Sequence, residues 1–111
     1  MSGLTETEYD DRAHPELLAL RDAIDALDDD DVDADLEAGI LTLEFSDDDR
    51  FVINSHRAAR QIWMAAGREA WHFDWDPGVG QWVATRTGAE LWATLARRLS
   101  DKLGKSVVLR P

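Results

Sequence analysis

The spacing of apolar residues changes twice along this 111-residue sequence, and these changes constrain the fold more than any other feature. In residues 15–27 apolar side chains recur every three or four positions, as they do on one face of a helix. From residue 32 to residue 85 apolar and polar residues largely alternate, which is typical of strands with one buried face. Leucines at every fourth position from Leu91 to Leu103 then restore the helical spacing. The predicted order is therefore helix, strands, helix.

Turn-forming residues divide the middle section into five or six strands. The expected strands cover residues 32–36, 41–45, 51–54, 61–65, 70–75 and 81–85, and glycine, aspartate or other polar clusters separate them. Successive strands with short connections form antiparallel pairs, and amphipathic helices bury their apolar faces against such a sheet. We therefore predict an α+β fold. It is a two-layer α-β sandwich, with the N- and C-terminal helices packed on one face of an antiparallel sheet, as a single domain over residues 1–111.

The ends of the two helices follow from different signals. Gly104 stands directly after the last leucine of the second helix, where glycine commonly caps a C-terminus. In the first helix Pro15 matters, because proline is accepted in a first turn and disrupts later turns. We expect this helix to begin near Ala13 or to be kinked at Pro15, although the polar residues 5–12 could add one or two turns.

Acidic side chains are concentrated in the first half of the chain. Residues 1–49 hold 18 acidic and 2 basic residues and residues 50–111 hold 5 and 10, which together give a net charge of −11. This charge argues against nucleic acid as a partner, because phosphates would be repelled. The sequence has no cysteine, which excludes disulfides and thiolate metal sites, and no apolar run long enough to span a membrane. The first residues lack the features of a signal or transit peptide, so we expect a cytoplasmic protein.

The densest acidic stretch joins the first helix to the first strand. Carboxylate oxygens are hard ligands that suit iron, manganese, magnesium and calcium ions, and a bound cation relieves repulsion among crowded carboxylates. Neighbouring strand residues cannot converge into a closed cage, so a metal here would be weakly held and largely hydrated. The alternative is a solvated acidic face, such as an adaptation to salt. The stretch comprises Asp22, Asp25, Asp28, Asp29, Asp30, Asp31, Asp33 and Asp35.

A second candidate surface lies on the face of the sheet that the helices leave open. If Ile62 and Met64 face the helices, alternation places Gln61 and Trp63 on the open face. We expect Trp63 to be exposed there. A tryptophan beside hydrogen-bonding amides, here Gln61 and Asn54, has the composition of an interface anchor, which favours a partner-binding surface.

Catalysis and a dedicated transition-metal site have little support. His14, His56 and His72 form no closely spaced pair of the kind that binds zinc, and we expect each to be a surface residue without a role, although His14 near the acidic helix could join a cation site. The sequence contains no nucleophile elbow, no phosphate-binding loop and no Ser-His-Asp spacing. We therefore expect a binding protein and not an enzyme.

The motifs form a recognisable ordered set. After the acidic helix and the Asp-rich strand come Gly39-Ile40-Leu41-Thr42-Leu43-Glu44-Phe45, Ile53-Asn54, Gln61-Ile62-Trp63, His72-Phe73-Asp74-Trp75, Trp82 and Gly88-x-x-Leu91-Trp92. Their order and spacing closely resemble those of the frataxin family, in particular its bacterial CyaY branch, from Thr7 to Leu103. This resemblance implies an α-β sandwich with both helices on one side of the sheet.

The resemblance also implies site residues and partners. Frataxins bind iron weakly through carboxylates and contact the cysteine desulfurase and the scaffold of iron–sulfur cluster assembly. Carried over by position, the implied metal-binding residues are Asp22, Asp25, Asp29, Asp31, Asp33 and Asp35. The implied partner-binding residues are Asn54, Gln61 and Trp63.

The resulting prediction is an iron-binding adaptor and regulator of iron–sulfur cluster assembly that binds the cysteine desulfurase and delivers or senses Fe²⁺. We expect a monomer, with iron-driven oligomers as a further outcome. One alternative is a ferroxidase or iron-storage protein, which would need a dinuclear carboxylate and histidine site. The other is that the acidic surface serves only as haloadaptation.

Overall fold

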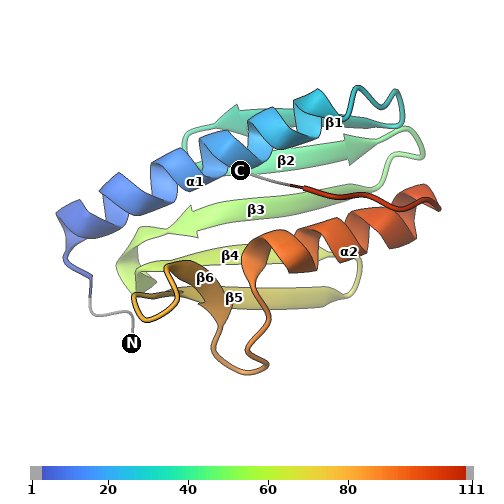
Figure 1. The fold of residues 1–111 in the computed structure, drawn as a ribbon. Coiled ribbons are helices and arrows are strands. Elements are labelled where there is room, and N and C mark those ends of the chain that lie inside the picture. The colour runs from blue at the N-terminus through green and yellow to red at the C-terminus, as the bar shows by residue number, and fades with distance from the viewer. Residues whose placement is uncertain (1–3, 110–111) are drawn as a thin grey trace.

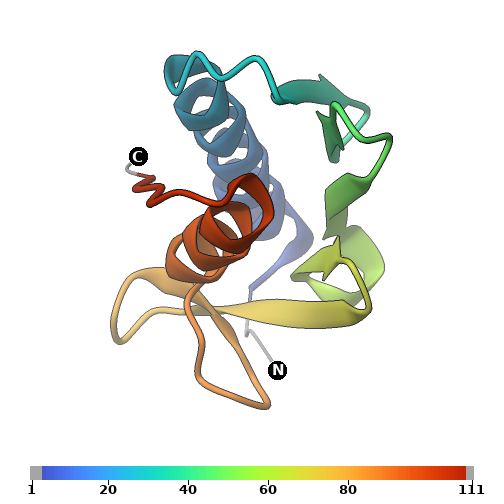
Figure 2. The same cartoon turned by 90° about the vertical axis from the view of Figure 1, so that its right-hand side faces the viewer.

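The computed structural model describes residues 4–109 as two layers (Figure 1). The helices α1 (Glu6–Ala26) and α2 (Leu91–Leu103) cover one face of a six-stranded antiparallel sheet. A view turned by 90° places both helices on the same side of the curved sheet (Figure 2). The strands are β1 (Val32–Glu37), β2 (Ile40–Phe45), β3 (Arg50–His56), β4 (Gln61–Ala66), β5 (Glu69–Asp76) and β6 (Gln81–Ala84). The predicted fold class is confirmed, with the larger of the two expected strand numbers.

The strands follow one another in the sheet in the order of the sequence, from β1 at one edge to β6 at the other. Every neighbouring pair is antiparallel, and a short 3₁₀ helix (Arg57–Ala59) is inserted between β3 and β4. The observed strands differ from the expected ones by one or two residues at their ends. The largest extension is in β3, which continues to His56 and so brings that side chain onto the sheet.

The helix α1 begins at Glu6 and continues through Pro15. The expected start near Ala13 is therefore wrong, and the alternative in which residues 5–12 extend the helix is confirmed. A capping box fixes the start. The Thr5 hydroxyl accepts a hydrogen bond from the Glu8 N–H at 3.1 Å, and the Glu8 carboxylate accepts one from the Thr5 N–H at 3.1 Å. Pro15 is exposed, whereas Tyr9 and Ala13 are buried on the opposite face. Capping and burial together offset the cost of the proline, which is about 3 kcal/mol inside a helix.

One hydrophobic core lies between the helices and the sheet. The predicted inward face of β4 is confirmed, since Ile62 and Met64 are 0% and 1% exposed. Gly104 ends α2 with a left-handed backbone (φ +69°), as predicted for its C-terminal cap. The chain beyond it packs back on the core through Val107 and Leu109.

Within residues 4–109 no helix combines the length and the apolar character needed to cross a membrane.

Candidate functional site

The predicted metal-binding carboxylates form a strip, here called the acidic ridge, that runs from the end of α1 through the α1–β1 loop onto β1. Asp22 and Asp25 are exposed on the last turns of α1. Asp33 and Asp35 are exposed on β1 and point away from the helices, because Val32 on the same strand is buried on the helix side. The ridge is therefore continuous along the chain, but its side chains point in different directions. Its members are Asp22, Asp25, Asp28, Asp29, Asp30, Asp31, Asp33 and Asp35.

Asp29 differs from the other members of the ridge because its carboxylate forms an ion pair with the segment after α2. Its carboxylate forms an ion pair with the Lys105 ammonium group and accepts a hydrogen bond from the Asp31 N–H at 2.8 Å. The Asp29 side chain is only 8% exposed. The Lys105 hydrogen bond and the Asp31 N–H lower the pKa of Asp29, because both stabilise the charged carboxylate. Asp29 thus ties the α1–β1 loop to the residues after α2 and is the least available ridge member for an external ligand.

Other acidic side chains are also paired with the basic second half of the chain. Lys102 bonds Asp47 and Asp49 at 2.6 and 2.9 Å, and these contacts lower the pKa of both carboxyl groups. Arg57 contacts Asp10 at 3.1 Å.

Within the ridge, Asp22 contacts its neighbour Arg21, and Asp31 accepts a hydrogen bond from the Ser46 hydroxyl. Within residues 4–109 the ridge carboxylates without a side-chain hydrogen bond or ion pair are Asp25, Asp28, Asp30, Asp33 and Asp35.

A carboxylate outside the predicted set extends the ridge across the sheet. Glu44 on β2 lies directly opposite Asp33 on β1 in the strand register, and both are exposed on the open face. Directly opposed residues in antiparallel strands have Cβ atoms about 5 Å apart, so these two negative charges repel each other. A cation bound between them would relieve that repulsion. Sequence reasoning missed this pair because it depends on the turn: the expected strands end at residue 36 and begin at residue 41, whereas the observed two-residue turn Ala38–Gly39 sets the hairpin register.

The described carboxylates form no enclosed cage for a metal ion. Among the residues that the structure describes, no three or more histidine, aspartate or glutamate side chains are grouped so that they could hold a metal ion. Asp33 and Glu44 supply the hard oxygen ligands that divalent cations with oxygen coordination prefer, and water would complete the shell. The residues therefore fit a hydrated divalent ion at an open carboxylate pair.

The second candidate surface, here called the Trp63 face, lies on the open side of β3, β4 and β5. Trp63 stacks between His56 and His72, with ring centroids 3.7 and 4.2 Å apart and interplanar angles of 18° and 12°. Asn54 and His72 flank Trp63 directly in the strand register. The indole lies on the open face as predicted, but it is half-buried, so the prediction that Trp63 is exposed is wrong. The expectation that His56 and His72 have no role is also wrong, because they cover the two faces of the ring.

Hydrogen bonds fix the orientation of the Trp63 ring edge. The indole N–H donates to the Gln61 side-chain oxygen at 2.8 Å, and the Gln61 amide nitrogen donates to Asp74 at 3.2 Å. The Gln61 backbone oxygen accepts a 2.6 Å hydrogen bond from the hydroxyl of the buried Tyr9 on α1. Burial raises the pKa of Tyr9, so this hydroxyl stays protonated and can donate at neutral pH. The Trp63 face is therefore pre-organised and attached to the acidic helix.

The comparisons with known proteins decide the family. A family model described as a frataxin-like domain matches residues 2–105. The chain belongs to the frataxin family. It is 34% identical to the iron-sulfur cluster assembly protein CyaY of Dechloromonas aromatica over 96% of this chain and 100% of that protein. It is 37% identical to the CyaY protein of Ralstonia nicotianae, covering 98% of this chain and 97% of the relative.

Solved frataxin structures share the fold. The frataxin of Psychromonas ingrahamii superposes with a TM-score of 0.87 at 24% identity, covering 97% of this chain and 100% of that one. A trimeric frataxin of Saccharomyces cerevisiae, complexed with ferrous iron, superposes with a TM-score of 0.73 at 27% identity, covering 95% and 91% of the two chains. The predicted membership of the bacterial frataxins is confirmed.

Within this frataxin fold, the two candidate surfaces occupy different parts of one sheet. The ridge runs onto the β1 edge, whereas Trp63 is on β4 near the other edge, and both use the open face. The strands between them contribute Thr42 of β2 and Asn54 of β3 to the same side. A partner that covers the open face can therefore contact carboxylates and the Trp63 stack at the same time.

Proposed function

We propose that the chain is an iron-binding adaptor of iron–sulfur cluster assembly that acts in the cytoplasm, without enzymatic activity, by docking on the cysteine desulfurase and on the assembly scaffold. Family membership and the names of the CyaY relatives support the pathway, and the ferrous complex of the yeast relative supports iron as the cargo. The observation that carries the proposal is the presence of unpaired carboxylates and a pre-organised tryptophan on one open sheet face.

Docking would use the two surfaces in different ways. The free carboxylates of the ridge would attract a basic patch on the desulfurase, since complementary charge speeds association. Trp63 and Gln61, held in one orientation by stacking and hydrogen bonds, would make the contacts that depend on shape. Pre-organisation lowers the entropy lost on binding, so the stack increases affinity without new contacts.

Iron would tune this docking through charge. Fe²⁺ held by Asp33 and Glu44 with water would reduce the negative charge at the β1 edge. The ridge would then attract a basic partner less strongly, or present the ion to it. Either effect makes the affinity for the desulfurase depend on Fe²⁺, which is the property expected of an adaptor that senses or delivers iron.

The test is a titration of the purified chain with the cysteine desulfurase of the same organism, together with a measurement of Fe²⁺ oxidation. We expect binding in the micromolar range that weakens with salt, and no acceleration of Fe²⁺ oxidation by the chain. Charge-neutralising changes at Asp33 and Glu44 should weaken binding. Accelerated oxidation would favour the ferroxidase alternative. No desulfurase binding, combined with ridge variants that change only the salt dependence of stability, would favour haloadaptation.

A further inference from the structure

One edge of the sheet is only half covered. The strand β5 pairs with β4 from Glu69 to Asp74, but β6 pairs only with residues 73–76 of β5. Beyond that point the chain turns away, because the Ala84 N–H donates to the Ala89 oxygen and the Ala84 oxygen accepts from the Gly88 N–H, both at 2.8 Å. Residues 69–72 of β5 therefore have no strand on their outer side within the part of the chain that the structure describes.

The register identifies the backbone groups that face this free edge. In a strand, the N–H and C=O groups of successive residues point to opposite sides. Ala84 stands opposite Phe73 and directs both of its backbone groups away from β5, so the β5 groups on this side belong to Ala70, His72 and Asp74. Asp74 is covered by β6, and Ala70 has no strand opposite it. An uncovered strand edge of this kind is a template for another strand.

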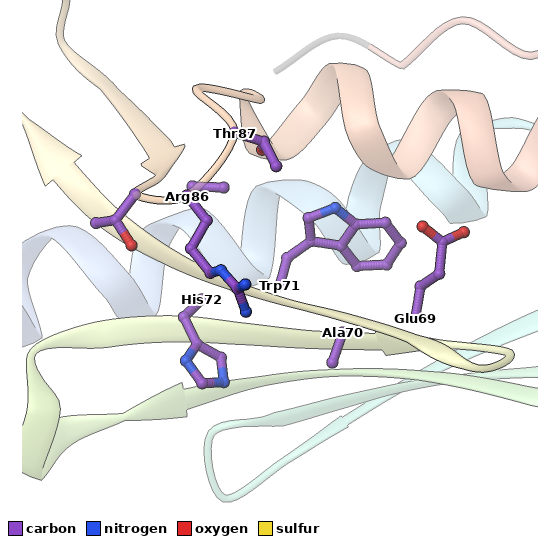
Figure 3. A pocket seen from close by; sticks show the side chains of 8 residues that line it. Glu69, Ala70, Trp71, His72, Arg86 and Thr87 are labelled. Atoms are coloured by element: carbon purple, nitrogen blue, oxygen red, sulfur yellow. The ribbon is translucent and has the colours of Figure 1, made fainter.

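A cavity of about 550 Å³ lies along this free edge (Figure 3). The indole of Trp71, 8% exposed, provides an apolar wall, and the exposed Arg86 extends from the β6–α2 loop toward β5. The Glu69 carboxylate is already paired with Arg98 at 3.0 Å. Within the part of the chain that the structure describes, the Arg86 side chain makes no ion pair or hydrogen bond, so its charge is available to a ligand of the cavity.

The free edge is continuous with the Trp63 face. Ala70 and His72 line this cavity and also border a shallow depression of about 120 Å³ beside Trp63 and Asn54. His72 itself stacks on Trp63. A partner seated on the Trp63 face can therefore extend a segment over His72 to the β5 edge. The acidic ridge lies at the opposite edge, so its charge does not repel an acidic segment here.

We propose that an extended segment of the cysteine desulfurase adds to residues 69–72 of β5 as a further strand, with a carboxylate of that segment paired with Arg86. The backbone groups at Ala70 would supply the main-chain hydrogen bonds, and Trp71 and Arg86 would select an apolar and an acidic side chain. In the free protein the Arg86 side chain extends toward this edge (Figure 3), and a charged side chain at a strand edge disfavours pairing with unrelated strands. The identity of the partner rests on the proposed function, whereas the edge and the cavity do not.

Amide hydrogen exchange of the full chain, measured with and without the desulfurase, tests this inference. We expect binding to slow the exchange of the Ala70 and His72 amides roughly tenfold or more, because these N–H groups face the free edge and a new strand partner protects them. Arg86→Glu should weaken binding about tenfold or more, as expected for the loss of a charge-assisted hydrogen bond. Arg97→Glu, an equal charge change at an exposed α2 position outside the cavity, is the matched control and should bind as wild type does.

A second variant addresses the backbone directly. Ala70→Pro removes the N–H that faces the free edge, and proline is accepted on the open side of an edge strand. It should retain the far-ultraviolet circular dichroism of the wild type and weaken desulfurase binding. Desulfurase binding without protection of the Ala70 and His72 amides would overturn the strand addition and leave the proposed function intact. Unchanged or tighter binding by Arg86→Glu would also overturn the proposed strand addition, because Arg86 would then not pair with a carboxylate of the partner. Absence of any desulfurase binding would contradict both proposals.

Discussion

The imidazole of His72 stacks on the indole of Trp63, with ring centroids 4.2 Å apart and planes 12° from parallel. Together with His56 on the other face, this contact holds a large aromatic side chain in one orientation on the open face of the sheet. An ordered and partly exposed tryptophan loses little conformational entropy on binding, which is the property of an interface anchor. The stack is therefore a structural reason to place a partner here.

The first prediction concerns that anchor. Trp63→Ala should weaken desulfurase binding by about 2 kcal/mol or more, as truncation of a central aromatic anchor does, while a cooperative unfolding transition is retained because the ring lies outside the hydrophobic core. Calorimetry and thermal unfolding measure the two effects. Val79→Ala, at an exposed apolar residue in the β5–β6 turn, is the control and should leave binding unchanged. Wild-type affinity in Trp63→Ala would mean that the partner does not use this face.

The second prediction separates the ridge carboxylates. Asp33→Asn and Glu44→Gln should each weaken Fe²⁺ binding, measured by anaerobic calorimetry, because each removes one charge of the opposed pair. Asp29→Asn should leave Fe²⁺ binding nearly unchanged, since Lys105 and the Asp31 N–H already occupy that carboxylate. A larger loss of Fe²⁺ binding in Asp29→Asn than in Asp33→Asn or Glu44→Gln would mean that the ion binds in the α1–β1 loop and not at the Asp33–Glu44 pair.

The third prediction concerns acid stability. The ion pair with Lys105 lowers the folded-state pKa of Asp29, so its contribution to stability is present above the pKa of the unfolded carboxyl, about 3.9. That contribution is lost as the pH falls through the lower folded-state pKa. The free energy of unfolding should therefore decrease below about pH 4, and less steeply in Asp29→Asn. Denaturant titrations at several pH values measure this, and identical slopes in both proteins would contradict it.

The fourth prediction concerns the link between α1 and β4. Tyr9→Phe removes the hydroxyl that donates to the Gln61 backbone oxygen at 2.6 Å. The variant should lose about 1–3 kcal/mol of unfolding free energy, because a part-buried carbonyl is left without its donor. Chemical denaturation measures the loss. A change below about 0.5 kcal/mol would mean that water replaces the hydroxyl and that the link adds little stability.

Much of the fold was predictable from the sequence because buried residues recur every second position in a strand and every third or fourth position in a helix. The alternation along β4 correctly placed Ile62 and Met64 inside and Gln61 and Trp63 outside. The start of α1 has a local cause that is visible in the sequence: the capping box of Thr5 and Glu8 starts the helix, and Pro15 is accepted because it lies on the exposed face.

The missed parts of the site depend on contacts between distant segments. The stack on Trp63 needs the register of three strands and the extension of β3 to His56, which periodicity alone does not set. The ion pair between Asp29 and Lys105 joins the α1–β1 loop to the segment after α2, and no local sequence pattern predicts it. The Asp33–Glu44 pair depends on a two-residue turn in which Ala38 has a positive φ, a conformation that the sequence alone does not indicate.

The central claim is that the ridge and the Trp63 face form one docking surface for the cysteine desulfurase, and that iron tunes it. The most direct measurement is the dissociation constant of the complex with and without Fe²⁺, for the wild type and for a variant that combines Asp33→Asn with Glu44→Gln. The account predicts that Fe²⁺ changes the wild-type constant and leaves that of the variant unchanged. A wild-type constant that does not respond to Fe²⁺, or an equal response in the variant, would contradict it.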